Sequence, residues 1–218
     1  MNRRASIVLF WVPLAATWFM MGVESPYIAA IVARMPAAEP SLAAFGVATA
    51  LAWLVESPIM MLFSAATALV HDRDSYLALR RFTFLLCTIV AFAMFLLGLP
   101  PVFHVVGERL IGLPPEIARL ARNATVILIL WPAAIGYRRF YQGVLVRHHL
   151  TRRVAYGTVV RLVAMSVTAA LFAMTTHFAG ATIGACALIA GVVSEAIASR
   201  WMAREVVSEL LGVAARFS

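Results

Sequence analysis

The tetrapeptide Val-Glu-Ser-Pro occurs twice in this 218-residue sequence, at Val23–Pro26 and at Val55–Pro58, each time within a long apolar stretch. Each copy places a carboxylate and a helix-bending proline among hydrocarbon side chains. A charged carboxylate at the centre of a membrane-spanning helix costs about 2.5–3.5 kcal/mol on the insertion scale for Asp, and an inert anchor gains nothing from it. The repeat therefore predicts a polar cavity or ion path between helices. The candidate substrate- or ion-binding residues are Glu24, Ser25, Pro26, Glu56, Ser57 and Pro58.

Each glutamate also admits a structural explanation, in which a neighbouring helix satisfies the carboxylate and the proline kinks the helix for packing. Neither Glu24 nor Glu56 has an obvious basic partner at equal depth along the helices expected from the sequence. Burial without a partner favours the neutral form of a carboxyl group. Such a group can load and unload a proton as its cavity opens to either side, so we expect Glu56→Gln to abolish pH-coupled transport.

The composition predicts an all-α, polytopic membrane protein. The chain is 63% hydrophobic and 13% charged, with a mean hydropathy of +0.90, whereas soluble domains are about 25% charged. The net charge of +8 is explained by membrane topology, so we expect membrane lipid and no nucleic acid as a partner. Cys87 and Cys186 each lie in an apolar run and are interpreted as small core residues.

Six apolar segments are predicted to span the membrane as a single bundle that covers residues 1–218. They run over about 6–33, 42–70, 82–99, 117–137, 154–176 and 180–201. A span needs about 20 residues, so the first two segments must tilt, kink or project beyond the bilayer. The first is interpreted as a retained helix rather than a cleaved signal peptide.

Arginine placement predicts the orientation, because cytoplasmic loops carry an excess of basic residues. With the N-terminus inside, the inner loops and C-terminal tail hold Arg3, Arg4, Arg73, Arg80, Arg81, Arg138, Arg139, Arg147, Arg152, Arg153, Arg200, Arg204 and Arg216. The outer side holds Arg34, Arg109, Arg119 and Arg122. We therefore expect both termini in the cytoplasm and an integral protein of the bacterial inner membrane. The basic stretch 138–153 is expected to face the cytoplasm and to meet anionic headgroups.

Two further charges, Arg161 and Glu195, lie inside the fifth and sixth segments. Arg161 follows Arg153 by about eight residues and Glu195 follows Gly180 by about fifteen, which places both in the inner half of consecutive antiparallel helices. We predict that they form a structural ion pair, with a gating or coupling pair as the alternative. Reversing both charges together should then rescue the folding lost in the single variants. Glycines along the sixth segment, at 180, 184 and 191, are expected to allow close helix packing.

No catalytic or metal-binding pattern is present in the sequence. It has no Gly-x-Ser-x-Gly, no His-Glu-x-x-His and no Gly-rich phosphate loop. The adjacent His148 and His149 lie beside arginines and lack nearby acidic ligands. We therefore expect neither an enzyme nor a metal site.

Several short motifs resemble a known transporter group. The stretches Gln142–Leu145, Thr151–Arg153 and Tyr156–Leu162 resemble the fourth-to-fifth helix region of the multidrug/oligosaccharidyl-lipid/polysaccharide flippase superfamily, which includes the multidrug and toxic compound extrusion exporters. The runs Gly180–Gly184 and Gly191–Glu195 resemble its progressive ankylosis branch. The resemblance implies a secondary transporter with alternating access and no cofactor beyond a coupling proton or sodium ion. Related members move organic cations, lipid-linked sugars, or anions such as pyrophosphate and citrate.

One departure from that superfamily bears on function. Its members have two six-helix halves, and six segments make only one half. We expect either a homodimer, which halves related by an axis along the membrane normal permit, or a missing second half. The leading hypothesis is a secondary active transporter or half-transporter for a small organic solute. The alternatives are a non-transporting membrane subunit or scaffold and a truncated, inactive fragment.

Overall fold

The computed structural model describes residues 3–212, with side chains described from residue 11 onward. This part of the chain is helical apart from short connections. Six helical segments are long and apolar enough to cross a membrane, as expected of an integral membrane protein. They are Trp11–Val32, Ala38–Leu69, Arg73–Gly98, Pro115–Arg147, Thr151–Thr175 and Gly180–Met202. The prediction of an all-α chain with six such segments is confirmed, while the side of the membrane on which each end lies stays a prediction.

Two of the spans are composite, and a proline marks each break. The second consists of α2 (Ala38–Glu56), the 3-10 turn η1 (Ser57–Met60) and α3 (Met61–Leu69). The fourth consists of α6 (Pro115–Ile127), η3 (Leu128–Leu130) and α7 (Trp131–Arg147). Pro58 lies in the first turn of η1, and Pro132 lies in the first turn of α7, directly after η3. At both positions the missing N–H costs least.

The other long helices are uninterrupted. They are α1 (Arg3–Val32), α4 (Arg73–Gly98), α8 (Thr151–Thr175) and α9 (Gly180–Met202). The short elements are α5 (Pro100–Phe103), the π-helical η2 (His104–Leu110) and α10 (Arg204–Leu210). Pro26 lies inside α1, which continues to Val32. The two Glu-Ser-Pro copies therefore have different local structures.

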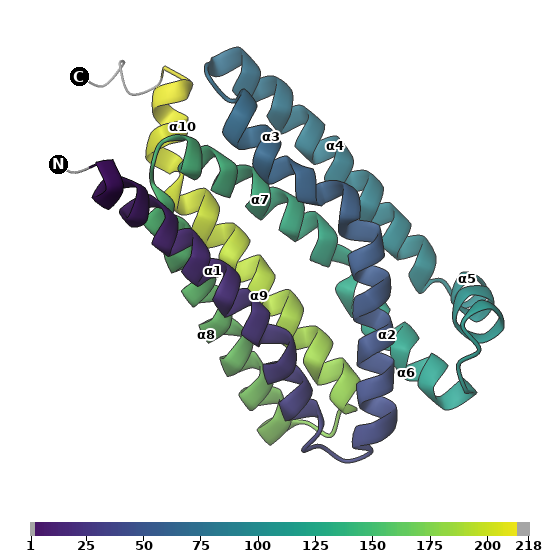
Figure 1. Cartoon of the computed structure of the whole chain (residues 1–218). Helices are drawn as coiled ribbons and strands as arrows, with labels where there is room; N and C mark the ends of the chain where they lie inside the picture. Colours follow the sequence, from purple (N-terminus) through teal and green to yellow (C-terminus); the bar gives the residue numbers. More distant parts are fainter. Residues whose placement is uncertain (1–2, 213–218) are drawn as a thin grey trace.

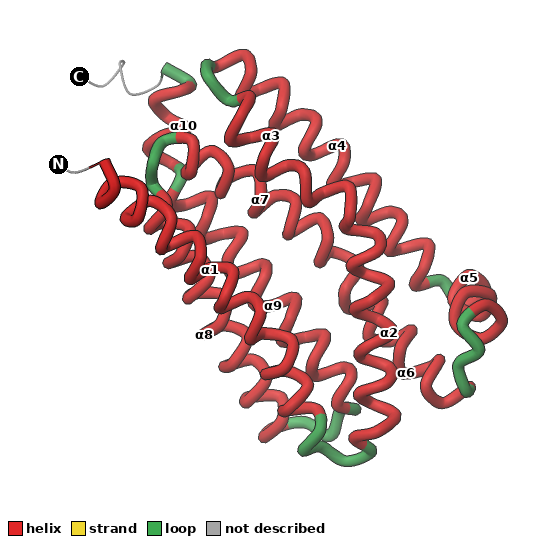
Figure 2. The backbone as a smooth tube through the Cα atoms, in the orientation of Figure 1, coloured by secondary structure: helices red, strands yellow, loops and turns green. Residues whose placement is uncertain are grey.

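The helices form two groups that meet along α9. In Figure 1, α1, α8 and α9 run side by side, and α3, α4 and α7 form the other group together with α2 and α6. Helix α9 contacts α7, α6 and α2 as well as α8 and α1, whereas α1 and α2 touch each other little beyond their connection. The α3–α4 and α7–α8 turns lie at the end of the bundle where α1 begins, and the α1–α2 and α8–α9 connections lie at the opposite end (Figure 2).

Local chemistry accounts for one helix start and several close contacts. Asp72 caps α4, because its Oδ1 accepts the Ser75 backbone N–H at 2.9 Å, and the Ser75 hydroxyl hydrogen bond holds the pKa of Asp72 below its ordinary value.

On α9, a Cβ at Gly184 would lie 2.9 Å from the Phe45 ring, and one at Gly180 would lie 2.9 Å from Val32 Cγ1. The predicted packing role of these glycines is confirmed.

The prediction for 138–153 is wrong over its first ten residues. These residues belong to α7, in which Arg138 is 1% exposed and Arg139 7% exposed. The break at η3 restarts the helix at Trp131, so the predicted end of the fourth span falls in the middle of α7. Arg138 and Arg139 therefore lie in the bundle interior and not in a loop that faces the cytoplasm.

Candidate functional site

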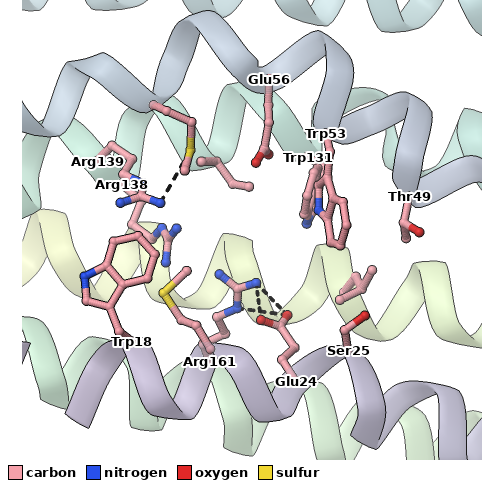
Figure 3. Close-up of a pocket in the computed structure, with 14 residues that line it drawn as sticks. Trp18, Glu24, Ser25, Thr49, Trp53, Glu56, Trp131, Arg138, Arg139 and Arg161 are labelled. Atoms are coloured by element: carbon pink, nitrogen blue, oxygen red, sulfur yellow. Dashed lines mark hydrogen bonds and ion pairs between the residues drawn. The ribbon is translucent and has the colours of Figure 1, made fainter. Parts of the chain in front are cut away.

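A cavity of about 150 Å³ lies in the middle of the bundle, between α1, α2–η1 and α7, with α8 and α9 behind it (Figure 3). Two shallower hollows on the described part of the chain differ from it, because they are lined almost entirely by apolar side chains. The residues that line it are Trp18, Met21, Glu24, Ser25, Thr49, Trp53, Glu56, Met60, Trp131, Ile135, Arg138, Arg139, Arg161 and Leu188. Five ionisable side chains thus share one small space within segments that can span a membrane.

Glu24 projects from α1 toward α8 and is 6% exposed. Its carboxylate accepts the Arg161 Nη2–H at 2.5 Å and the Arg161 Nε–H at 3.1 Å. The expectation that Glu24 lacks a basic partner is therefore wrong. Because α1 packs along α8, a residue 137 positions away in sequence supplies the partner.

Glu195 is fully buried on α9 and receives hydrogen bonds from two neighbouring helices, α7 and α8. Its Oε2 accepts from Arg138 Nη1 at 2.6 Å and from Arg161 Nη1 at 3.4 Å. Its Oε1 accepts from Gln142 Nε2 at 3.0 Å and from Thr158 Oγ1 at 3.2 Å. Four charges thus alternate in sign in the order Glu24, Arg161, Glu195 and Arg138, and we refer to them as the ion-pair chain.

The contact between Arg161 and Glu195 exists, but it is not an isolated pair. It is the longer of the two ion-pair contacts that each residue makes, since Arg161 is closer to Glu24 and Glu195 is closer to Arg138. Charge alternation along the chain offsets the desolvation of all four groups together. Removing any one of them leaves a neighbour with reduced compensation.

Glu56 and Arg139 lie outside the ion-pair chain. Glu56 extends from the end of α2, on the wall opposite Glu24, and its Oε2 is buried without a hydrogen-bond partner in the described part of the chain (Figure 3). Arg139 donates to Met60 Sδ at 3.5 Å, and its guanidinium carbon lies 5.6 Å from the centre of the Trp18 ring. No carboxylate among the described side chains lies within ion-pair distance of Arg139.

The serines and prolines of the repeat divide between cavity and surface. Ser25 lines the cavity, whereas Pro26, Ser57 and Pro58 are exposed and do not line it. The Ser57 hydroxyl donates instead to the Leu54 carbonyl of its own helix at 2.9 Å. Successive residues of a helix are rotated by about 100°, so the proline two positions after each inward glutamate lies on the opposite side of the helix and points away from the cavity.

Sequence reasoning missed the basic and aromatic walls of the cavity. Arg138 and Arg139 were assigned to a loop, and Trp18, Trp53 and Trp131 were not assigned to any site. The local signal for the two arginines was their position after the Trp131-Pro132 break, with the apolar and aromatic run 140–146 following them. A loop seldom contains such a run, and a helix continuing through the arginines explains it.

The cavity reaches the side of the bundle between α1 and α2. Four of its lining residues are exposed, namely Trp18, Ser25, Trp53 and Met60, and all of them lie along this seam. Trp18 is 61% exposed and Trp53 54% exposed. The opening is therefore lateral, and tryptophan rings border it.

Comparison of the chain with known protein families, curated proteins and solved structures finds no match. The resemblance to the flippase superfamily thus stays a prediction. Within residues whose side chains are described, no group of three His, Cys, Asp or Glu residues could hold a metal ion.

Proposed function

We propose that this protein is a secondary active transporter, or one half of one, that moves a small organic solute across the membrane by alternating access. The observation that carries the proposal is the charged cavity in the middle of a bundle whose six long segments can span a membrane. Ionisable groups at this depth are costly, and they characteristically mark substrate and ion pathways. A scaffold subunit has no use for an unpartnered carboxyl group beside a cavity.

Glu56 is the group proposed to carry the coupling proton. Its Oε2 accepts no hydrogen bond from the described residues, and its carboxyl group borders the cavity. A carboxyl group in this position changes its protonation state when the cavity opens to water on one side or the other. Glu24, which Arg161 holds in a double hydrogen bond, is proposed as a structural tie instead.

Helix α1 is proposed as the element that moves. Among the described side chains, the Glu24–Arg161 contact is the only ion pair between α1 and the rest of the bundle. Because Arg161 also contacts Glu195, it keeps a partner when Glu24 moves away. A second copy of the chain or a separate second half would complete a two-lobed transporter, as the resemblance implies, with membrane lipid around it.

The test is proton-coupled flux in proteoliposomes that contain a trapped pH-sensitive dye. Organic acids, amines and amino acids are added in turn, with and without an imposed pH gradient. We expect at least one solute to move protons with the wild-type chain, and Glu56→Gln to abolish this coupled movement. The matched control is Glu116→Gln, since Glu116 is exposed in the first turn of α6. Normal coupling in folded Glu56→Gln protein would refute the proposed role of Glu56, and no coupled flux for any solute would refute transport.

A further inference from the structure

Four buried polar atoms at the cavity lack a hydrogen-bond partner in the described structure. They are Arg138 Nε, Arg139 Nε, Trp131 Nε1 and Glu56 Oε2. These side chains are 1%, 7%, 4% and 8% exposed, respectively. Buried polar groups in native proteins are almost always hydrogen-bonded, so four unsatisfied ones around one space indicate a site built for a polar ligand.

The chemistry of these atoms selects the charge of the ligand. Three of the four are N–H donors, and two of these belong to guanidinium groups. Within the ion-pair chain, two carboxylates compensate Arg138 and Arg161. Among the described side chains that line the cavity, Arg139 is the cation without an ion-pair partner, and its contacts are a thioether and an indole ring. The ligand that complements this arrangement accepts hydrogen bonds and carries one negative charge, and a carboxylate fits the planar guanidinium fork.

Glu56 requires a proton whenever such an anion is bound. The charged groups that face it are Arg138 and Arg139 on α7, Arg161 on α8 and Glu24 on α1 (Figure 3). An ionised Glu56 would itself compensate Arg139 and would repel a second anion in the same space. A protonated Glu56 leaves the charge of Arg139 to the ligand and can donate a hydrogen bond to it. The anion and the charge on Glu56 therefore exclude each other.

The size and walls of the cavity limit the rest of the ligand. Its volume of about 150 Å³ is similar to that of an engineered protein cavity that holds benzene, which corresponds to roughly six non-hydrogen atoms. Trp18, Trp53 and Trp131 supply ring surfaces beside the charged groups. The ligand is thus short, with one acidic end.

From these observations we propose that the cavity binds a small organic monocarboxylate together with one proton. The carboxylate accepts hydrogen bonds from Arg139, Arg138 and Trp131, and the proton resides on Glu56. This assignment of the ligand rests on the same cavity as the proposed transport function, but it concerns equilibrium binding and can be tested without flux.

The test uses the full chain in nanodiscs of zwitterionic lipid, with L-lactate as the probe and the neutral L-lactamide as its matched analogue. Binding is followed by tryptophan fluorescence, because three tryptophans line the cavity, and is checked by calorimetry. We expect saturable binding of lactate, no binding of lactamide, and a Kd at least tenfold weaker in Arg139→Gln. The control Arg109→Gln, at an exposed position outside the cavity, should bind as the wild type does. The affinity of the wild-type chain should fall as the pH rises, whereas Glu56→Gln should bind lactate with no such pH dependence.

The outcomes separate the ligand assignment from the transport proposal. Equal binding of lactamide, or unchanged binding in Arg139→Gln, would overturn the anion site. Arg139→Lys keeps the positive charge but loses the planar guanidinium fork, so it should retain part of the affinity for lactate. Partial binding in this variant would show that the loss in Arg139→Gln does not come from a folding defect. Because the opening is lateral, laurate serves as a lipid-derived carboxylate, and binding of laurate without lactate would overturn the assignment to a short acid. If lactate binds but no solute shows coupled flux, the anion site is supported and transport is refuted. If an amine or neutral solute shows coupled flux and lactate does not bind, transport is supported and the anion site is refuted.

Discussion

Exchanging the charges at positions 161 and 195 tests whether the buried charges act as one chain or as separate pairs. In the double variant Arg161→Glu/Glu195→Arg, an isolated pair would be restored with opposite polarity. In the structure, each residue has a second and closer partner, Glu24 for Arg161 at 2.5 Å and Arg138 for Glu195 at 2.6 Å. The exchange therefore places two carboxylates together at one end of the chain and two guanidinium groups together at the other.

The distances set the size of the expected effect. With an effective dielectric constant of about 20, unit charges at the 2.6 Å separation of Arg138 and Glu195 interact by about 6 kcal/mol. At the 3.4 Å separation of Arg161 and Glu195 the interaction is about 5 kcal/mol. The exchange keeps the weaker attraction and turns both stronger ones into repulsions. We therefore expect the double variant to be at least as unstable as either single variant, each of which should lose about 3–5 kcal/mol from breaking a buried pair.

The assay is the unfolding midpoint of detergent-purified protein, together with the folded fraction recovered from membranes. Exchanging all four charges, at 24, 161, 195 and 138, restores the alternation and should recover part of the stability lost in the double variant. Glu205→Gln is the control, because its ion pair with Arg153 lies at the surface and should shift the midpoint little. A wild-type midpoint in the double variant would refute the four-charge chain and would establish Arg161 and Glu195 as an independent pair.

Two further perturbations probe the packing and the caps. Gly143→Ala should lower the free energy of unfolding by about 1–3 kcal/mol, and with it the unfolding midpoint, since its Cβ would lie 2.6 Å from the Phe63 carbonyl oxygen. Gly46→Ala, with nothing within 4 Å of the new Cβ, should be neutral or slightly stabilising. The pKa of Asp72 is held below its ordinary value of 3.8 by the Ser75 hydrogen bonds, so the cap stabilises the fold above that pH and is lost as the pH falls through the lowered value. Midpoints measured from about pH 5 down to about pH 3 should fall less steeply in Asp72→Ala than in the wild type, and parallel curves would contradict the cap.

The bounds of a span can be predicted from the sequence where one apolar run forms the helix. They are predicted wrongly where a charged residue is buried within the helix. Hydropathy ends a helix at Arg138, because an arginine alone in hydrocarbon is unfavourable. In the structure, the carboxylate of Glu195, 57 residues later in the sequence, compensates this arginine inside the bundle. The local sequence can thus indicate that a helix continues through Arg138, but it does not report the partner on another helix that keeps this arginine inside the bundle.

The sequence also did not determine how deep each buried charge lies in the membrane. Counting residues from an assumed membrane face gives Glu24 no basic partner at equal depth, yet its carboxylate is in contact with Arg161. Helix α1 has 30 residues and is therefore about 45 Å long, against about 30 Å for the hydrocarbon core. The excess of about 15 Å leaves the starting face of the count undetermined, and tilt adds to the uncertainty. For Glu24 and Arg161, sequence position thus identified that both groups are buried, but not that they are neighbours.

The two Glu-Ser-Pro copies show how far a repeated motif can be interpreted before three-dimensional partners are known. In the first copy the helix continues past Pro26, and Glu24 contacts Arg161 of α8. In the second copy the α-helix ends at Glu56 and a 3-10 turn follows, so that Glu56 faces the cavity without a hydrogen bond to its Oε2 from the described residues. The structural explanation therefore fits Glu24, which is suited to hold helices together. The functional explanation fits Glu56, which is suited to exchange a proton. What distinguishes them is a guanidinium on another helix, and identical tetrapeptides carry no information about it.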